Sequence, residues 1–166
     1  RFFSGFTLMM GYYKNPEATV AVVKLHADGK RWLHTGDLGY MDENGVLYVT
    51  GRLKRILTTK GRDGNPTKIF PDRIEKVVAR HEAVAECCAI GISDRERMHY
   101  PVVFAALRPG LWMRERVTEE ILDRCRKELP AYMIPEAVIY RDDLPRTPRG
   151  KVDYRELEKM ALDWNL

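Results

Sequence analysis

Two short stretches of this 166-residue sequence combine residue types that can bind sugar hydroxyls and phosphate oxygens. Thr35-Gly36-Asp37 places a carboxylate directly after a glycine, where it can accept hydrogen bonds from a vicinal diol such as a ribose. Gly51-Arg52-Leu53-Lys54 combines a glycine, which permits close backbone approach, with a guanidinium suited to phosphate or ribose oxygens. Each stretch alone has a simpler interpretation, because Asp37 can cap a turn and the two cations can lie in solvent.

A third stretch, residues 145–151, carries a lysine with possible catalytic chemistry. It reads Pro-Arg-Thr-Pro-Arg-Gly-Lys, and its two prolines and glycine predict a shaped loop rather than a helix or strand. The loop presents Lys151 just before the last predicted helix. An ammonium group there suits a developing phosphorane or a carboxylate, although an exposed basic loop would look the same in isolation.

The elements that must hold these stretches change character near residue 52. Residues 1–51 are rich in glycine, aromatic residues and turn signals. Asn15 is expected to cap a short helix that begins at Pro16. The dipeptides Asp28-Gly29 and Asn44-Gly45 predict hairpin turns, with strands at 32–35 and 46–49 around the second turn.

Strand and helix patterns alternate over residues 55–162, which predicts a small mixed domain of the α+β or α/β type, built as a two-layer sheet with helices. A loop is expected at 60–68. Strands are predicted at 55–59, 84–92, 102–107 and 137–140, and helices beginning at Pro71, Thr118 and Asp153. The predicted organisation is therefore a β-rich segment at 1–51, a connection at 52–54, and a small domain at 55–166.

Composition narrows the class of protein. The sequence is 45% hydrophobic and 31% charged, with a formal net charge of +4, which fits a site for anionic ligands. The absence of a block of like charges argues against a nucleic-acid partner, and no apolar run reaches the roughly 20 residues of a membrane span. Cys87, Cys88 and Cys125 have neither disulfide nor zinc spacing, so reduced thiols in a cytoplasmic protein are expected.

Taken in order, five motifs resemble the adenylate-forming superfamily of AMP-forming acyl-CoA synthetases, peptide-synthetase adenylation domains and firefly-type luciferases. The resemblance covers nearly the whole chain and implies a C-terminal portion, preceded by a β-rich piece of a larger N-terminal domain. Because the chain starts at Arg1 without a Met or a signal peptide, it is interpreted as cut from something longer. The motifs are Gly11–Thr19, Trp32–Gly39, Asp42–Lys54, Ile69–Glu75 and Leu144–Val152.

The resemblance implies a role for each nucleotide-site residue. Asp37, with Thr35 and Gly36, would bind the ATP ribose, and Arg52 would contact ribose or phosphate. Lys151 would bridge the carboxylate substrate and the α-phosphate during adenylation.

Two further roles concern the second half-reaction. Lys54 would be the hinge about which the small domain turns, and a loop glycine would let the backbone approach the pantetheine arm of CoA. Gly61 and Gly64 are both candidates for that glycine, because the loop is longer than in most relatives. Met98-His99 replaces the Gly-Glu that many relatives carry, which puts the role of that turn in doubt.

The function implied is ligation of a carboxylic acid, expected to be a fatty acid, to CoA. ATP, Mg²⁺ and CoA are the expected substrates or cofactors, and no metal-binding residue is expected in this chain. The isolated chain is expected to be inactive, because the phosphate loop and acyl pocket of the family would lie before Arg1. Two alternatives stay open: an adenylation domain that loads the phosphopantetheine of a carrier protein, and a non-catalytic regulatory module.

Overall fold

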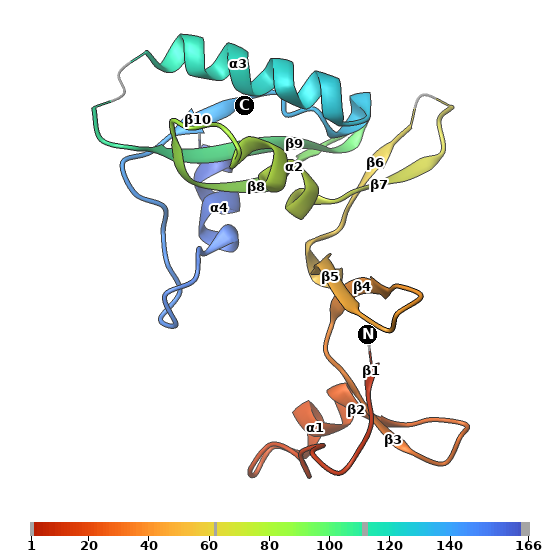
Figure 1. The fold of residues 1–166 in the computed structure, drawn as a ribbon. Coiled ribbons are helices and arrows are strands. Elements are labelled where there is room, and N and C mark those ends of the chain that lie inside the picture. The colour runs from red at the N-terminus through yellow and green to blue at the C-terminus, as the bar shows by residue number, and fades with distance from the viewer. Residues whose placement is uncertain (1, 62, 111–112, 164–166) are drawn as a thin grey trace. The chain divides into compact units, whose positions relative to one another are not determined.

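The computed structural model describes residues 2–61, 63–110 and 113–163. The chain divides into two compact units, Arg1–Lys54 and Arg55–Leu166 (Figure 1). Within the described residues, no helix is long and apolar enough to cross a membrane.

The first unit consists of a three-stranded antiparallel sheet, one short helix and a separate hairpin. Asn15 caps the helix as expected, because its Oδ1 accepts a hydrogen bond from the amide of Ala18 at 2.9 Å. The sheet has the order β1-β3-β2. The elements are β1 (Phe2–Phe3), α1 (Pro16–Val22), β2 (Val23–Leu25), β3 (Arg31–His34), β4 (Asp37–Met41) and β5 (Leu47–Arg52).

Both predicted hairpin turns form, but one predicted pairing is wrong. The strand expected at 32–35 does not lie across the Asn44-Gly45 turn from 46–49. It is β3, which pairs with β2 across Asp28-Gly29 and with β1. The partner of β5 is β4, a strand that the sequence analysis did not predict.

A mixed three-stranded sheet forms the centre of the second unit. Its order is β10-β9-β8, with β8 antiparallel and β10 parallel to β9. The hairpin of β6 and β7 precedes the sheet. The elements are a 3-10 turn (Leu53–Arg55) shared with the first unit, β6 (Leu57–Lys60), β7 (Pro66–Ile69), α2 (Pro71–Val78), β8 (Val84–Asp94), β9 (Met98–Leu107), α3 (Arg114–Glu128), a 3-10 turn (Ala131–Met133), β10 (Val138–Tyr140) and α4 (Tyr154–Asp163).

Helices cover both faces of this sheet, as Figure 1 shows with α3 above it and α4 below it. One buried cluster joins α2 and α3 to one face, with Ile74, Ile121 and Val103 among its members. The other joins α4 to the opposite face through Leu157 and Phe104. The mixed class of the domain is confirmed, and α4 adds a layer to the expected two.

Several predicted boundaries shift, including the start of β9, which lies at Met98 rather than Val102. The strand predicted at 55–59 begins at Leu57, because residues 53–55 form a 3-10 turn. The loop expected at 60–68 ends earlier, since Pro66–Ile69 pairs with β6 as β7. Helix α3 begins at Arg114 rather than Thr118, which adds the buried Val117 to its inward face.

The three cysteines are free, as expected. Cys88 and Cys125 are buried and Cys87 is half-buried. Burial raises the pKa of Cys87 and Cys88 to about 12 and that of Cys125 to about 11, because thiolates are poorly solvated there. These thiols are therefore unreactive packing groups rather than nucleophiles.

Candidate functional site

Asp37 and Arg52 lie directly opposite each other in the β4–β5 hairpin of the first unit. The Nε of Arg52 is 2.8 Å from Oδ1 of Asp37. The Nη1 of the same guanidinium donates to the carbonyl of Thr35 at 3.3 Å. The register of one hairpin thus brings together a carboxylate and a guanidinium that are 15 positions apart in sequence.

The Thr35-Gly36-Asp37 turn fixes the carboxylate of this pair. Gly36 has a φ of +74°, a left-handed conformation that side-chain-bearing residues rarely adopt. The hydroxyl oxygen of Thr35 accepts from the Asp37 amide at 3.1 Å, and the Gly36 carbonyl accepts from the Leu53 amide at 2.8 Å. The four residues predicted to form a nucleotide site in this unit are therefore one hydrogen-bonded group.

The residue types of this group suit a ligand with hydroxyls and phosphates. A carboxylate offers about four acceptor positions, so that of Asp37 can accept from more than one donor. The Arg52 side chain is 56% exposed and that of Asp37 is 25% exposed. An acceptor for hydroxyls therefore lies beside a solvent-accessible cation, which suits a ligand that carries both a diol and a phosphate.

Lys54 lies two residues beyond Arg52, in the 3-10 turn Leu53–Arg55. Its side chain is exposed. The division between the two compact units falls directly after it, between Lys54 and Arg55. A residue at such a boundary can change its backbone angles without disrupting the core of either unit.

Arg55, the next residue, was not predicted as functional, but its side chain bonds to several groups of the second unit. Its Nη2 is 2.6 Å from Oε1 of Glu75 and donates to the Ala89 carbonyl at 2.9 Å. Its guanidinium also lies 5.4 Å from the ring centroid of Tyr154. Burial alone would lower the pKa of Arg55, but its bonds to Glu75 and Asp72 raise that pKa well above the ordinary value.

Lys151 lies in a short ordered hairpin that leads into α4. The Thr147 amide donates to the Lys151 carbonyl at 2.7 Å, and the Asp153 amide donates to the Pro145 carbonyl at 2.7 Å. Asp153 then caps α4 by accepting from the amides of Arg155 and Glu156 at 3.1 and 3.3 Å. The backbone is therefore fixed, while the Lys151 side chain is exposed and has no ion-pair partner among the residues that the structure describes.

Gly61 and Gly64 lie at the tip of the β6–β7 hairpin. Gly64 has a φ of +79°, and its amide donates to the Gly61 carbonyl at 2.9 Å. A Cβ on Gly61 would lie 2.8 Å from both Asp63 Oδ1 and Thr67 Oγ1. The hairpin geometry therefore accounts for a glycine at both positions, and it favours neither over the other as a ligand contact.

The structure does not bring Lys151 together with Gly61 and Gly64. Figure 1 shows the loop before α4 and the tip of the β6–β7 hairpin at opposite sides of the second unit. In the described residues, no group of three or more His, Cys, Asp or Glu side chains could hold a metal ion.

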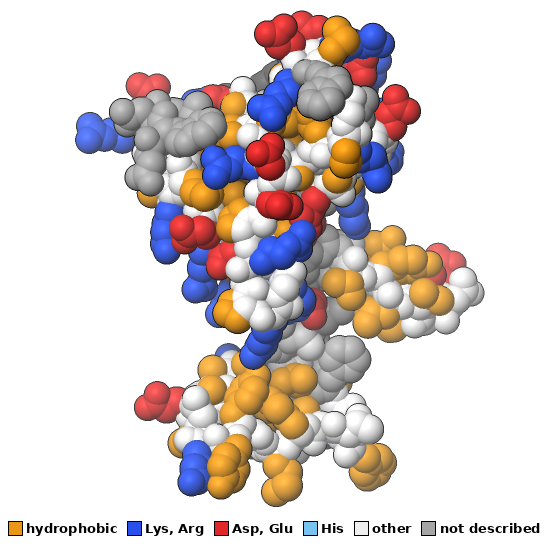
Figure 2. All heavy atoms as spheres, turned by 90° about the vertical axis from the view of Figure 1, so that its left-hand side faces the viewer, with side chains coloured by type: hydrophobic (Ala, Val, Ile, Leu, Met, Phe, Trp, Pro, Cys, Tyr) orange, Lys and Arg blue, Asp and Glu red, His pale blue; other side chains and the backbone are white. Residues whose placement is uncertain are grey.

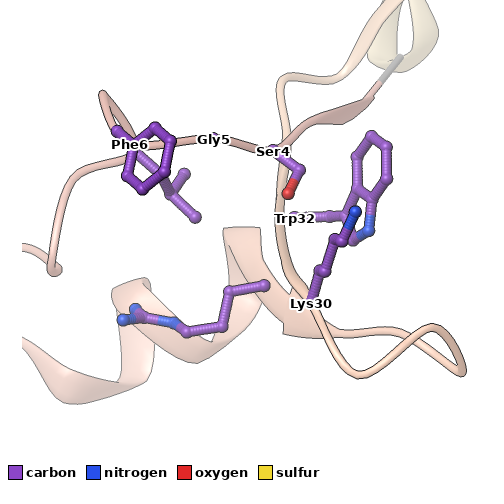
Figure 3. Close-up of a pocket in the computed structure, with 7 residues that line it drawn as sticks. Ser4, Gly5, Phe6, Lys30 and Trp32 are labelled. Carbon is purple, nitrogen blue, oxygen red and sulfur yellow. The ribbon is translucent and has the colours of Figure 1, made fainter.

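One pocket of about 620 Å³ lies in the first unit and contains none of the predicted site residues (Figure 3). Its lining is largely apolar and comes from residues 4–8 and from residues 30–32 at the start of β3. The residues that line it are Ser4, Gly5, Phe6, Leu8, Lys30, Arg31 and Trp32.

The domain around Lys151 has a defined class. Residues 73–151 match the family model of the AMP-binding enzyme C-terminal domain, so the resemblance seen in the motifs is confirmed. The chain matches the C-terminal part of adenylate-forming acid–CoA ligases.

Its curated relatives include the long-chain-fatty-acid–CoA ligase of Bacillus subtilis, 37% identical over 150 residues, which are 90% of this chain and 24% of that protein. The 2-succinylbenzoate–CoA ligase of Bacillus cereus is 35% identical over 151 residues, covering 91% of this chain and 28% of that protein. The chain therefore spans about a quarter of the length of the relatives it matches.

The solved structures that this chain resembles also include acid–CoA ligases. The anthranilate–CoA ligase AuaEII in complex with anthranoyl-AMP gives a TM-score of 0.82 at 28% identity, over 99% of this chain and 30% of that one. The o-succinylbenzoate–CoA synthetase of Bacillus subtilis with its acyl-adenylate intermediate gives a TM-score of 0.76 at 30% identity, over 95% of this chain and 29% of that one.

Proposed function

We propose that this chain is the C-terminal part of an AMP-forming acid–CoA ligase, and that Lys151 is its adenylation lysine. One observation carries the proposal: an exposed ammonium group on a backbone-fixed loop, within an AMP-binding enzyme C-terminal domain. Such a group can neutralise negative charge that develops at a reacting phosphoryl centre without reorganising its own support.

The first half-reaction joins the acid to AMP. A carboxylate oxygen of the acid attacks the α-phosphorus of ATP, the bond from that phosphorus to the bridging oxygen breaks, and pyrophosphate leaves with the bonding electrons. Lys151 would contact the attacking carboxylate and an α-phosphate oxygen, so that two anions can approach each other. The product is an acyl-adenylate.

The first unit would hold the nucleotide. Asp37 would accept hydrogen bonds from the ribose hydroxyls, and Arg52, which orients Asp37, would contact ribose or phosphate. This assignment is supported by the way one hairpin joins the two side chains at 2.8 Å. Thr35 and Gly36 would act through the turn that fixes the carboxylate.

The second half-reaction transfers the acyl group to CoA. The thiol sulfur attacks the acyl carbonyl, the bond to the phosphate oxygen breaks, AMP leaves, and the thiol proton passes to solvent or a base. We infer that the second unit turns at Lys54 between the steps and that Gly61 or Gly64 then contacts the pantetheine arm. The placement of Lys151 and this hairpin tip on opposite sides of the unit supports such a division of labour.

The remaining parts of the enzyme would come from a larger N-terminal domain. Most exposed large hydrophobic side chains of the described residues belong to the first unit, as Figure 2 shows for one face. An exposed apolar surface of this kind is typical of part of a domain whose apolar side chains are buried against the rest of that domain. The described residues offer no set that fits Mg²⁺, so magnesium would accompany the phosphates of ATP.

The substrate would be a carboxylic acid, and a fatty acid is favoured because the relatives named above include a long-chain-fatty-acid–CoA ligase. The three free thiols support a reducing compartment such as the cytoplasm.

The test is whether the full-length protein, with its N-terminal domain, ligates an acid to CoA. Incubation with ATP, CoA and a panel of carboxylic acids should form one AMP and one pyrophosphate per acyl-CoA. Formation of ADP and phosphate, or no consumption of ATP with any acid, would contradict the proposal. A product that appears only with a phosphopantetheinylated carrier protein would identify the carrier-loading alternative. The 166-residue chain alone should show no turnover and little ATP binding by calorimetry.

A further inference from the structure

An irregularity in β8 turns Glu86 toward the face of the sheet that carries α4. The pairing of β8 with β9 shifts register between Val84 and Glu86. Val84 therefore lies in the core with α2 and α3, although Cys88 and Ile90, at positions of the same parity, lie in the core with α4. A bulge of this kind re-aims the side chains that follow it. Glu86 then shares the face of Cys88, on which the Lys151 loop is also anchored through Leu144.

Arg146 joins that carboxylate to the tip of the loop. Its Nη2 donates to Oε2 of Glu86 at 2.7 Å, and its Nη1 donates to the carbonyl of Gly150 at 3.0 Å. The backbone of Arg146 also forms a bridge with Val152. One planar guanidinium thus cross-links the strand to the residue that precedes Lys151.

These bonds restrain the two peptide planes that flank the Cα of Lys151. The Gly150 carbonyl belongs to the peptide unit that contains the Lys151 amide, and Arg146 holds it. The Lys151 carbonyl belongs to the next unit, and the Thr147 amide holds it at 2.7 Å. Fixing both planes fixes the direction of the Cα–Cβ bond from which the ammonium group projects.

We propose that Arg146 and Glu86 form a positioning pair that sets the direction of Lys151 for the adenylation step. This inference rests on the proposed function, because it assigns a role through Lys151 rather than through contact with substrate. The pair is well suited to that role because a guanidinium donates through two nitrogens held rigidly in one plane, whereas a lysine at position 146 would offer a single nitrogen on a flexible chain.

The pair should matter more for catalysis than for stability. The Arg146 and Glu86 side chains are 49% and 34% exposed. Exposed ion pairs contribute little to folding, whereas displacement of a catalytic group by about 1 Å can reduce a rate by about a hundredfold. A split between rate and stability therefore separates a positioning role from a purely structural one.

The experiment compares three variants of the full-length ligase with wild type: Arg146→Ala, Glu86→Ala and Arg149→Ala. Arg149→Ala is the matched control, because Arg149 is exposed and its replacement removes the same charge from the same loop. Acyl-adenylate formation is followed by pyrophosphate exchange, and acyl transfer is followed from supplied acyl-adenylate. Thermal unfolding and amide exchange over residues 145–153 are measured on the same proteins.

We expect Arg146→Ala to slow adenylation by roughly ten- to a hundredfold, with the KM for ATP and the acyl-transfer step little changed. Glu86→Ala should give a smaller loss, because the bond from Arg146 to Gly150 survives. Arg149→Ala should behave as wild type. The amides of Thr147 and Gly150 should exchange faster in Arg146→Ala at an unchanged melting temperature.

Equal losses in Arg149→Ala and Arg146→Ala would show an effect of charge alone and overturn the proposal. Unchanged adenylation or unchanged amide exchange in Arg146→Ala would overturn it as well. A wild-type chain that forms no acyl-adenylate would instead contradict the proposed function, and the amide exchange would then decide whether Arg146 holds the loop.

Discussion

Arg55 and Glu75 form a two-pronged ion pair at the point where the second unit begins. Nη1 of Arg55 lies 3.1 Å from Oε2 of Glu75, and Nη2 lies 2.6 Å from Oε1. Glu75 Oε1 also accepts from the Ala89 amide at 2.8 Å. The residue after the proposed hinge is therefore bonded to both α2 and β8. Rotation at Lys54 would leave Arg55 fixed to its own domain.

Removal of one partner of this pair should destabilise the second unit. The Arg55 and Glu75 side chains are only 15% and 19% exposed, so Arg55→Ala leaves a largely buried carboxylate without its cation. The expected loss in the free energy of unfolding is about 3 kcal/mol, measured by urea unfolding followed by circular dichroism. Arg73→Ala, an exposed arginine on the same helix as Glu75, should cost less than about 0.5 kcal/mol. Equal small losses in both variants would contradict this account of the pair.

Met98 is expected to be a site of local strain. It has a φ of +73°, at the first residue of β9. The left-handed conformation costs a side-chain-bearing residue roughly 1–2 kcal/mol, which exceeds the entropic cost of introducing a glycine. Met98→Gly should therefore raise the free energy of unfolding by about 0.5–1 kcal/mol. Met98→Ala keeps the Cβ and should bring no gain, and a gain from alanine as large as that from glycine would refute the strain.

The buried thiols should make the fold sensitive to alkali. Their pKa values are raised by burial, to about 12 for Cys87 and Cys88 and about 11 for Cys125. Below about pH 7.5, well under the ordinary thiol pKa of about 8.5, the thiols are protonated in both states, so they add no pH dependence. As pH rises from about 9 toward 11, the unfolded chain loses protons that the folded chain retains, and stability falls by up to about 1.4 kcal/mol per pH unit and thiol.

The contribution of Cys125 to this pH dependence can be measured by comparing the urea unfolding of Cys125→Ala with that of wild type at pH 8, 9 and 10. The variant should start less stable because of its cavity, but its stability should fall less steeply with pH, since one ionising thiol is gone. Parallel pH profiles for the two proteins would show that Cys125 does not contribute.

Asp37 should be required for nucleotide affinity in the full-length ligase. Asp37→Ala removes the proposed acceptor for the ribose hydroxyls, and hydrogen bonds to a charged group contribute about 1.5–3 kcal/mol. The KM for ATP should therefore rise by roughly ten- to a hundredfold in steady-state assays. Glu43→Ala, which removes an exposed carboxylate from the turn of the same hairpin, should leave that KM unchanged. An unchanged KM in Asp37→Ala would remove the ribose assignment.

The parts of the fold that follow local rules could be predicted from the sequence. Asn15 and Pro16 define the start of α1, and Asp28-Gly29 and Asn44-Gly45 form turns, because each signal acts on neighbouring residues. The pairing of β5 was predicted wrongly because strand partners are set by contacts far apart in sequence. β7 was missed because its first residue, Pro66, reads as a strand breaker, although a proline is tolerated at a strand start.

The residues of the candidate site also fall into two groups, those indicated by local sequence and those brought together only by the fold. Asp37, Arg52 and Lys151 could be proposed as site residues because their motifs are contiguous stretches of unusual composition. The roles of Arg55 and Arg146 could not, because an arginine in a list of residues gives no sign of whether it lies in solvent or bonds a distant glutamate. Glu75 and Glu86 become their partners only when α2 and β8 are packed into one domain.

The half-reactions of the Lys151→Ala variant test the central claim most directly. In the full-length ligase, the account predicts that acyl-adenylate formation, followed by pyrophosphate exchange, falls at least about a hundredfold, while acyl transfer to CoA from supplied acyl-adenylate stays within a few-fold of wild type. Normal acyl-adenylate formation by Lys151→Ala, or equal losses in both half-reactions, would contradict the assignment of Lys151 as the adenylation lysine.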